Sequence, residues 1–182
     1  MISSVEVADA QAMVRAGQVV AAHLRAGDVV ILDGPLGAGK TTLARGVGQG
    51  LGVRGALTSP TFVLARVHPP VAGSTPLVHV DAYRLESLEE MEALDLDVSL
   101  AESITLVEWG KGKVESLAQE HLVLSITRRL GQPCLAAGDT VAAEHGGQTR
   151  TLGVQGTANR WPEQAVQALL AELAGSVVAP TP

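Results

Sequence analysis

One short stretch restricts the possible folds of this chain more than any other part of the sequence. The residues Gly34-Pro35-Leu36-Gly37-Ala38-Gly39-Lys40-Thr41-Thr42 follow directly after the apolar run Val29-Val30-Ile31-Leu32. A glycine, four further residues and then Gly-Lys-Thr form the phosphate-binding pattern that joins a strand to a helix in α/β proteins. The stretch therefore predicts a buried strand, a phosphate-binding loop and a helix, in that order.

The residue types in this loop suit the binding of nucleotide phosphates. Glycines let the backbone turn sharply and bring several N–H groups to one anion, because no Cβ atom blocks the approach. Lys40 would place a positive charge at the β- and γ-phosphates, and the Thr41 hydroxyl is a hard oxygen ligand suited to Mg²⁺. The positive end of the following helix, expected from Thr42 onward, adds its dipole to the same site. We therefore predict a nucleotide site formed by Leu36, Gly37, Ala38, Gly39, Lys40, Thr41 and Thr42.

Length and composition fit one domain in which helices cover a sheet. The 182 residues are enough for a single substantial core. Hydrophobic residues make up 46% of the chain and aromatic residues only 2%, so the core must be built from Val, Leu and Ala. Such a composition is typical of an α/β sheet.

Charge and cysteine content argue against several classes of function. A net charge of −6 argues against an extended basic surface that binds nucleic-acid phosphates unaided. The single cysteine, Cys134, excludes an internal disulfide and a multi-cysteine metal site, and is compatible with a reducing cytoplasm. No apolar run reaches ~18 residues, and the N-terminus lacks the order of a signal peptide. We therefore expect a cytoplasmic protein without a membrane segment.

The rest of the chain predicts further helices and strands in one domain over residues 1–182. After a short edge strand in residues 1–8, Asp9 is a candidate N-cap for a helix over residues 10–24. Phe62 is expected to open a strand, and Ser87 to cap an acidic helix. Other strands are expected at residues 29–33, 77–81, 104–109, 122–127 and 149–154, a loop at 68–76, and a last helix at 162–173.

The late part of the chain is expected to differ from the first part. Residues 128–147 have no clear period and are expected to form a hairpin excursion, and residues 175–182 a frayed tail. The predicted fold is an α/β, P-loop NTPase-like three-layer domain. Its sheet is expected to be mostly parallel, with antiparallel strands late in the chain.

Two carboxylates, Asp81 and Glu108, follow directly after patterns of buried strands. Ligands of open α/β sheets bind outside the carboxyl ends of the strands. A P-loop enzyme also needs an acid across the site to hold the Mg²⁺ shell and to position the attacking water. Each carboxylate alone could equally be a solvated or capping residue. Together with the loop, they predict Lys40, Asp81 and Glu108 as catalytic residues, and Thr41, Asp81 and Glu108 as metal ligands.

Three nearby residues each have two interpretations. Trp109, one of only two tryptophans, is either a packing residue or a ring exposed near the nucleotide or a partner. Thr61 is either a hydroxyl that senses the γ-phosphate or an ordinary strand residue. His79 lies within a predicted strand and is expected to be a satisfied core residue rather than a ligand.

At these residues the sequence resembles the TsaE family of small bacterial ATPases, which takes part in tRNA threonylcarbamoyladenosine biosynthesis. Four blocks in this order and spacing carry the resemblance. The first is the loop described above, which by itself is typical only of a superfamily. The other three are more specific: Thr58-Ser59-Pro60-Thr61-Phe62, His79-Val80-Asp81-Ala82-Tyr83-Arg84-Leu85 and Leu106-Val107-Glu108-Trp109.

The resemblance implies an ATPase that uses ATP and Mg²⁺ and acts with two partner proteins, TsaB and TsaD, in the t6A37 modification of tRNA. It implies that tRNA is contacted only through that complex. It also implies that Lys40 and the loop amides hold the phosphates and that Asp81 and Glu108 complete the metal and water site. Thr61 would be switch-like and Trp109 would lie near the nucleotide, and Gln11 aligns less securely with a nucleotide-contacting position.

Two other functions stay open from the sequence. A small-molecule kinase is one, but kinases usually need arginine-rich lid elements that exclude water, and the arginines here are few and dispersed. A nucleotide-dependent binding switch with negligible turnover is the other. Incubation with ATP and Mg²⁺, with and without the two partners, would separate these functions.

Overall fold

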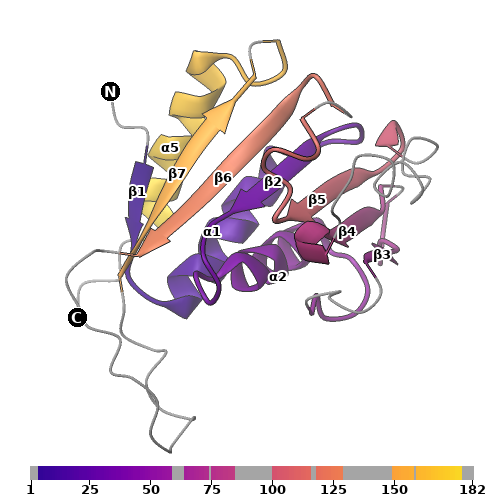
Figure 1. The fold of residues 1–182 in the computed structure, drawn as a ribbon, viewed down its shortest axis with the longest axis horizontal. Helices are drawn as coiled ribbons and strands as arrows, with labels where there is room; N and C mark the ends of the chain where they lie inside the picture. Colours follow the sequence, from indigo (N-terminus) through magenta and orange to yellow (C-terminus); the bar gives the residue numbers. More distant parts are fainter. Residues whose placement is uncertain are drawn as a thin grey trace, which may run out of the picture.

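The computed structural model describes residues 4–58, 64–73, 75–84, 100–115, 118–128, 149–157 and 159–177. Within these ranges the chain forms one seven-stranded sheet, three α-helices and a short 3₁₀ helix (Figure 1). The elements are β1 (Ser4–Val7), α1 (Ala10–Ala22), β2 (Val29–Asp33), α2 (Lys40–Leu51), β3 (Ala65–His68), β4 (Leu77–Asp81), η1 (Ala82–Arg84), β5 (Ile104–Glu108), β6 (His121–Arg128), β7 (Arg150–Gly156) and α5 (Glu163–Val177).

The sheet has the strand order β1-β7-β6-β2-β5-β4-β3. Its four central strands are parallel, since β2 pairs in parallel with both β5 and β6, and β4 pairs in parallel with β5. The predicted α/β, P-loop NTPase-like fold with antiparallel late strands is confirmed, because β7 is antiparallel to β6 and to β1. In addition, β3 is antiparallel to β4 at the other edge. The parallel centre therefore has an antiparallel border on each side.

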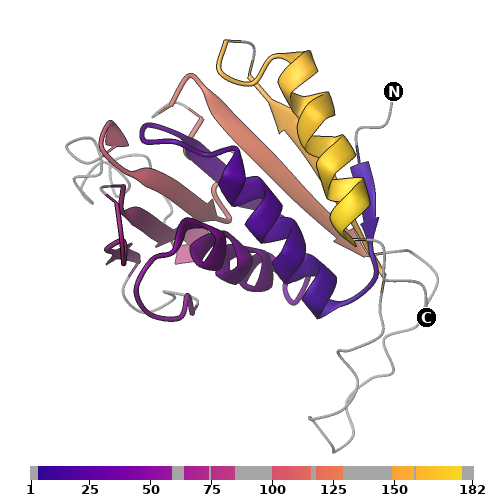
Figure 2. The same cartoon turned by 180° about the vertical axis from the view of Figure 1, so that it is seen from behind.

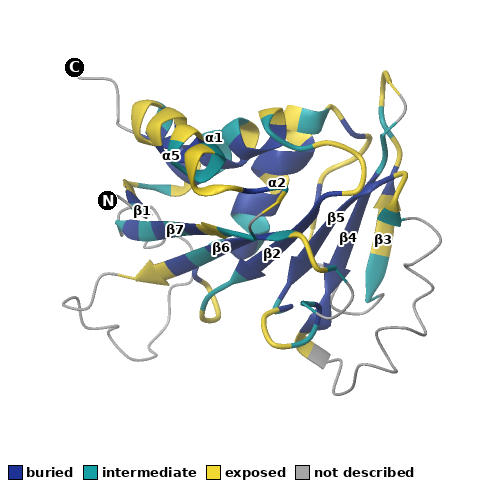
Figure 3. Ribbon diagram, turned by 90° about the horizontal axis from the view of Figure 1, so that it is seen from above, coloured by how far each residue is buried: buried dark blue, intermediate teal, exposed yellow. Residues whose placement is uncertain are grey.

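Both faces of the central strands are buried, which explains their unbroken apolar runs. Alternate residues of β2 enter two different cores: Val30 and Leu32 face the larger one, and Ile31 faces the smaller one. The larger core lies under α1, α2 and α5, which Figure 2 shows side by side on one face of the sheet. Figure 3 shows the buried strands below these helices.

The two helices nearest the phosphate-binding loop cross in backbone contact. A Cβ atom on Gly17 of α1 would meet the carbonyl oxygen of Leu43, and one on Gly46 of α2 would meet that of Val14. Neither carbonyl belongs to a flexible side chain that could move aside. The crossing therefore requires glycine at these two positions and ties α1 closely to α2.

The C-terminal segment is fastened to the start of β2. The Arg160 guanidinium donates to both carboxylate oxygens of Asp28 at 2.7 Å, and also to the carbonyl oxygen of His23. A bidentate pair of this kind, nearly buried, holds a defined geometry. It brings the residues before α5 against the junction between α1 and β2.

Several boundaries differ from the predictions. The strand β3 ends at His68, where the sequence predicts a loop, because this buried histidine pairs with Leu77 of β4. The frayed tail expected from residue 175 is wrong for residues 175–177, because α5 continues to Val177, whose side chain is buried in the larger core.

Other predictions fall partly or wholly on parts of the chain that are not described. The start of the strand opened by Phe62, the helix capped by Ser87 and residues 129–147 of the hairpin excursion lie outside the described residues. Residue 128 itself belongs to β6. Among the described residues, no helix has the length and apolar character needed to cross a membrane.

Candidate nucleotide-binding site

The polar residues of the site meet at one edge of the sheet, where the parallel strands end. β2 ends at Asp33, β4 at Asp81 and β5 at Glu108. In the register of the sheet, Glu108 lies between Leu32 on one side and Asp81 on the other. The two carboxylates predicted from the sequence are therefore direct neighbours across adjacent strands.

The loop between β2 and α2 has the backbone that its glycines allow. Gly34 has φ +145° and Gly39, the N-cap of α2, has φ +115°, both in the region that side chains rarely adopt. A Cβ atom on Gly34 would also meet the carbonyl oxygen of Ile126 on β6. The loop is thus held close against the sheet, and the first turn of α2 begins at Lys40.

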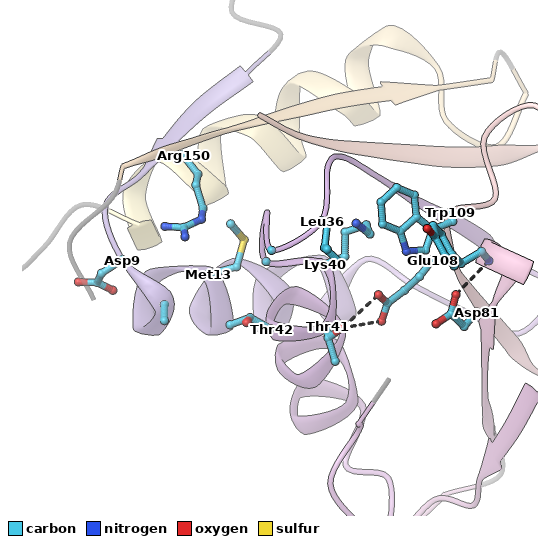
Figure 4. A pocket seen from close by; sticks show the side chains of 14 residues that line it. Asp9, Met13, Leu36, Lys40, Thr41, Thr42, Asp81, Glu108, Trp109 and Arg150 are labelled. Carbon is cyan, nitrogen blue, oxygen red and sulfur yellow. Dashed lines mark hydrogen bonds between the residues drawn. The ribbon is translucent and has the colours of Figure 1, made fainter. Parts of the chain in front are cut away.

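A cleft of about 550 Å³ opens over this loop (Figure 4). Its size suits a nucleotide, since sites for small molecules are typically clefts of about 300–1,000 Å³. Most of the residues predicted for the site line it: Leu36, Gly37, Gly39, Lys40, Thr41, Thr42, Asp81, Glu108 and Trp109. Residues not predicted for the site line it too: Asp9, Ala10, Met13, Tyr83 and Arg150.

Glu108 is the centre of the hydrogen bonding at one end of the cleft. Its side chain is almost fully buried, and both of its oxygens lie 3.0 Å from the hydroxyl of Thr41. The ring of His79 contacts Oε1, also at 3.0 Å. Thr41 and Glu108, two of the three predicted metal ligands, are thus already joined by a hydrogen bond in this structure.

Lys40 makes contacts that a phosphate group would have to replace. Its ammonium donates to the carbonyl oxygens of Gly34 at 2.7 Å and Pro35 at 3.1 Å, and it lies 3.5 Å from the centre of the Trp109 ring. Burial lowers the pKa of Lys40, while the negative charges of Glu108 and other nearby carboxylates oppose that change. A phosphate would supply the charged partner that the two carbonyls do not.

Trp109 lies at the mouth of the cleft in a strained backbone conformation. Its φ is +62°, which costs a residue with a side chain roughly 1–2 kcal/mol. Its N–H donates to the carbonyl oxygen of Leu32, and its ring packs against Tyr83 with 5.1 Å between the ring centres. Tyr83 is 62% exposed, so the aromatic pair reaches from the cleft to the surface. The Trp109 ring thus packs against Tyr83 and lies beside the loop lysine, at the cleft predicted to bind the nucleotide.

Oxygen donors at this end of the cleft fit a magnesium ion. Thr41, Asp81 and Glu108 offer hydroxyl and carboxylate oxygens, the ligand types that Mg²⁺ prefers. Asp81 also accepts a hydrogen bond from the N–H of Tyr83 at 3.0 Å, which orients its carboxylate. In the described part of the chain, no group of three or more His, Cys, Asp or Glu residues could hold a metal ion. The ion would therefore need phosphate and water oxygens to complete its shell.

Two arginines at the opposite side of the loop were missed by the sequence reasoning. Arg150, at the start of β7, donates to the carbonyl oxygen of Ala38 at 2.8 Å, and Arg128, at the end of β6, donates to that of Leu36 at 2.9 Å. Burial and the neighbouring Arg128 lower the pKa of Arg150. The two arginines are far apart in the sequence but directly opposite each other in the β6–β7 register.

The wall of the cleft beside Arg150 is formed by the start of α1. Figure 4 shows Asp9, Met13 and Arg150 at the end of the cleft away from Glu108. Asp9 caps α1 as predicted, since its side chain accepts from the N–H of Ala12 at 2.7 Å. Ala10 and Met13 face the cleft from one side of the helix because residues three apart share a face.

Of the predicted site residues that the structure describes, two do not line the cleft. Ala38 is fully buried, and its N–H donates within the loop to the carbonyl oxygen of Pro35. Gln11 lines an adjoining groove of about 400 Å³ between α1 and α2, which shares Ala10 and Thr42 with the cleft. Thr61 lies outside the described residues.

Comparisons with known proteins agree with this architecture. A family model described as "Threonylcarbamoyl adenosine biosynthesis protein TsaE" matches residues 7–132. That range contains the loop, Asp81 and Glu108, but it ends before Arg150.

Individual relatives extend the match over more of the chain. A "tRNA threonylcarbamoyladenosine biosynthesis protein TsaE" from Streptomyces coelicolor is 55% identical over 154 residues, which cover 84% of this chain and 96% of the relative. A protein of the same name from Mycobacterium tuberculosis H37Rv is 50% identical over 119 residues, 62% of this chain and 71% of the relative. The crystal structure of Bacillus subtilis YdiB superimposes with a TM-score of 0.63 and 28% identity, covering 94% of this chain and 93% of that one.

Proposed function

This chain belongs to the TsaE family of threonylcarbamoyl adenosine biosynthesis proteins, and we propose that it is a Mg²⁺-dependent ATPase. One observation carries the proposal: Thr41 at the start of α2 is hydrogen bonded to Glu108 at the end of β5, beside a lysine aimed at the phosphate-binding loop. This arrangement joins a metal-ligand hydroxyl to an acid across the site, as phosphoryl-transfer sites require.

Each residue of the site has its own role in the proposed reaction. Lys40 and the loop N–H groups hold the β- and γ-phosphates and neutralise charge that grows on the γ-phosphoryl oxygens. Glu108 orients the water whose oxygen attacks the γ-phosphorus as the bond to the ADP oxygen breaks. Bound Mg²⁺ supplies positive charge to the phosphate oxygens, and Thr41, Asp81 and Glu108 are the residues that would hold it.

Hydrolysis is proposed in preference to transfer of phosphate to a metabolite. The structure brings Arg128 and Arg150 to the loop, which their dispersed sequence positions did not predict. Both, however, donate to backbone carbonyl oxygens of the loop. They therefore hold the loop in place. Arginines of a lid would instead close over the acceptor of the phosphate.

We further propose that the ATPase acts in the cytoplasm together with TsaB and TsaD, and meets tRNA only through that complex. The relatives are named for tRNA threonylcarbamoyladenosine biosynthesis, a modification that a nucleotide-binding site cannot carry out by itself. A net charge of −6 makes strong binding to tRNA by this chain alone unfavourable. The exposed Tyr83 ring beside Trp109 is a surface through which a partner could sense the nucleotide.

The proposal is tested by phosphate release from ATP, with and without Mg²⁺, in the presence and absence of TsaB and TsaD. We expect Mg²⁺-dependent hydrolysis and nucleotide-dependent binding to the partners, and weak tRNA binding by the protein alone. Lys40→Ala should lose productive nucleotide binding while its thermal unfolding stays that of the native protein. Full ATP affinity and turnover in Lys40→Ala would contradict the assignment of the loop, and phosphate transfer to an added metabolite would favour a kinase.

A further inference from the structure

A buried histidine lies directly behind the central carboxylate of the cleft. His79 is in the middle of β4 and is fully buried, as predicted for a core residue, but it is not fully satisfied, because Nδ1 has no hydrogen-bond partner among the described residues. The partner of Nε2 is not an ordinary core group. The ring Nε2 lies 3.0 Å from Oε1 of Glu108 on the adjacent strand β5.

The contact with His79 distinguishes the two oxygens of Glu108. The Thr41 hydroxyl lies 3.0 Å from both oxygens, whereas His79 contacts Oε1 alone. The terminal torsion of a glutamate side chain has only a weak intrinsic preference, so Thr41 by itself would leave the plane of the carboxylate poorly defined. A second donor on one oxygen fixes that plane. We propose that His79 is a positioning residue, which holds Oε1 and thereby aims Oε2 of Glu108 at the reacting end of the nucleotide.

The hydrogen-bond pattern also assigns the ring proton. An ionised carboxylate only accepts hydrogen bonds, so Nε2 carries the proton and Nδ1 presents its lone pair. Nδ1 is buried and has no hydrogen-bond partner among the described residues. A leucine at this position would avoid burying that unpaired nitrogen, so packing alone does not account for a histidine here.

Two amide substitutions separate positioning from packing. In His79→Gln the side-chain nitrogen is as many bonds from Cα as the histidine Nε2, so an N–H donor stays within reach of Glu108. In His79→Asn the amide nitrogen takes the place of Nδ1, and the side chain is too short for this nitrogen to reach Glu108. The two variants carry the same functional group, and His79→Leu serves as the apolar comparison.

We expect hydrolysis per bound ATP to fall about ten- to hundredfold in His79→Asn and His79→Leu, and to stay within about threefold of the native rate in His79→Gln. The gain in nucleotide affinity on adding Mg²⁺, measured by titration with ADP, should shrink in His79→Asn and His79→Leu only. Affinity for ADP without Mg²⁺ should be unchanged in all three. Equal losses in the Gln and Asn variants, or losses that follow the thermal unfolding midpoints, would overturn the positioning role.

This inference rests on the proposed ATPase function. A spectroscopic measurement distinguishes failure of the role of His79 from failure of the ATPase proposal. Long-range ¹H–¹⁵N spectra of the nucleotide-free protein should show the Nε2–H tautomer for His79, with a shifted signal in Glu108→Gln. The Nδ1–H tautomer would overturn the role of His79 even in a protein that hydrolyses ATP. The expected tautomer and Mg²⁺-linked ADP binding without any hydrolysis would instead overturn the ATPase proposal alone.

Discussion

At the Glu108 end of the cleft, three side chains are hydrogen bonded to one another, whereas at the Arg150 end two arginines donate to the backbone of the loop. Thr41, His79 and Glu108 form a connected group of polar side chains at the first end. At the second end, Arg150 donates to Ala38, and Met13 contributes an apolar wall. The two ends lie in one cleft but are built from different kinds of interaction.

This difference indicates a division of work between the ends. Bonds between side chains can rearrange when phosphate and a metal ion arrive, so the Glu108 end is suited to the reaction itself. Bonds from an arginine to loop carbonyls set the shape of the loop before any ligand is present, so the Arg150 end is suited to affinity. Substitutions at the Glu108 end should therefore change the rate of hydrolysis, and substitutions at the Arg150 end should change nucleotide affinity.

The largest effect is expected from removing the charge at the reacting end. Glu108→Gln keeps the shape of the side chain but loses the negative charge that orients water and metal, so hydrolysis should fall about a hundredfold or more. The dissociation constant of ADP, which depends on the loop, should change much less. Phosphate release and calorimetric titration measure the two quantities.

Asp81→Asn is the companion variant, because Asp81 is the neighbour of Glu108 in the sheet register. It should also lower hydrolysis more than affinity. Native rates of hydrolysis in both variants would show that the acids of the reaction lie elsewhere.

A substitution at the helix crossing should change both ends together. In Gly46→Ala the new methyl group meets the carbonyl oxygen of Val14, which cannot move without shifting α1, so stability should fall by about 2 kcal/mol. Chemical denaturation measures this loss. Because α1 carries Met13 and α2 carries Thr41, nucleotide affinity and hydrolysis should decline in parallel.

Gly175→Ala is the matched control for the helix crossing. It changes a glycine of α5 around which no atom lies within 4 Å of the added Cβ, so it should leave stability equal or slightly higher. If Gly46→Ala were as harmless as Gly175→Ala, the crossing would not couple the two ends.

The smallest of the three effects is expected at the Arg150 end. Arg150→Ala removes a nearly buried charged donor from the Ala38 carbonyl, which should weaken nucleotide binding about tenfold with little change in the rate per bound ATP. Arg128→Ala removes a similar bond from the exposed Leu36 carbonyl and should have a weaker effect. A drop in the rate per bound ATP equal to that of Glu108→Gln would erase the distinction between the ends.

The Glu108 end could be predicted from the sequence because its parts follow from local patterns. Each of β2, β4 and β5 is an apolar run that ends in a polar residue, and parallel strands present their carboxyl ends at one edge. The bond from His79 to Glu108 could not be predicted, since it depends on the register between two strands.

The Arg150 end was largely missed because long-range antiparallel pairing creates it. The predicted strands 122–127 and 149–154 on either side of a hairpin bring Arg128 and Arg150 near each other, but only the β6–β7 register shows that they are directly opposite. The start of α1 was correctly predicted from Asp9, but the face of the helix that meets the cleft was not. The resemblance suggests Gln11, which lines the adjoining groove, while Ala10 and Met13 line the cleft itself.

The pairing of β1 with β7 has a consequence for the order in which this protein folds. In the described sheet, β1 has β7 as its one neighbour, and Ser4 pairs with Gly153, so β1 pairs with a strand that is synthesised much later. The parallel strands that end in Asp81 and Glu108 are complete well before Arg150 has been synthesised. Pairings this distant in sequence form slowly. A nascent chain therefore contains the phosphate-binding loop and its acids before it contains Arg150, which braces the loop, and nucleotide binding should mature only once β7 has paired.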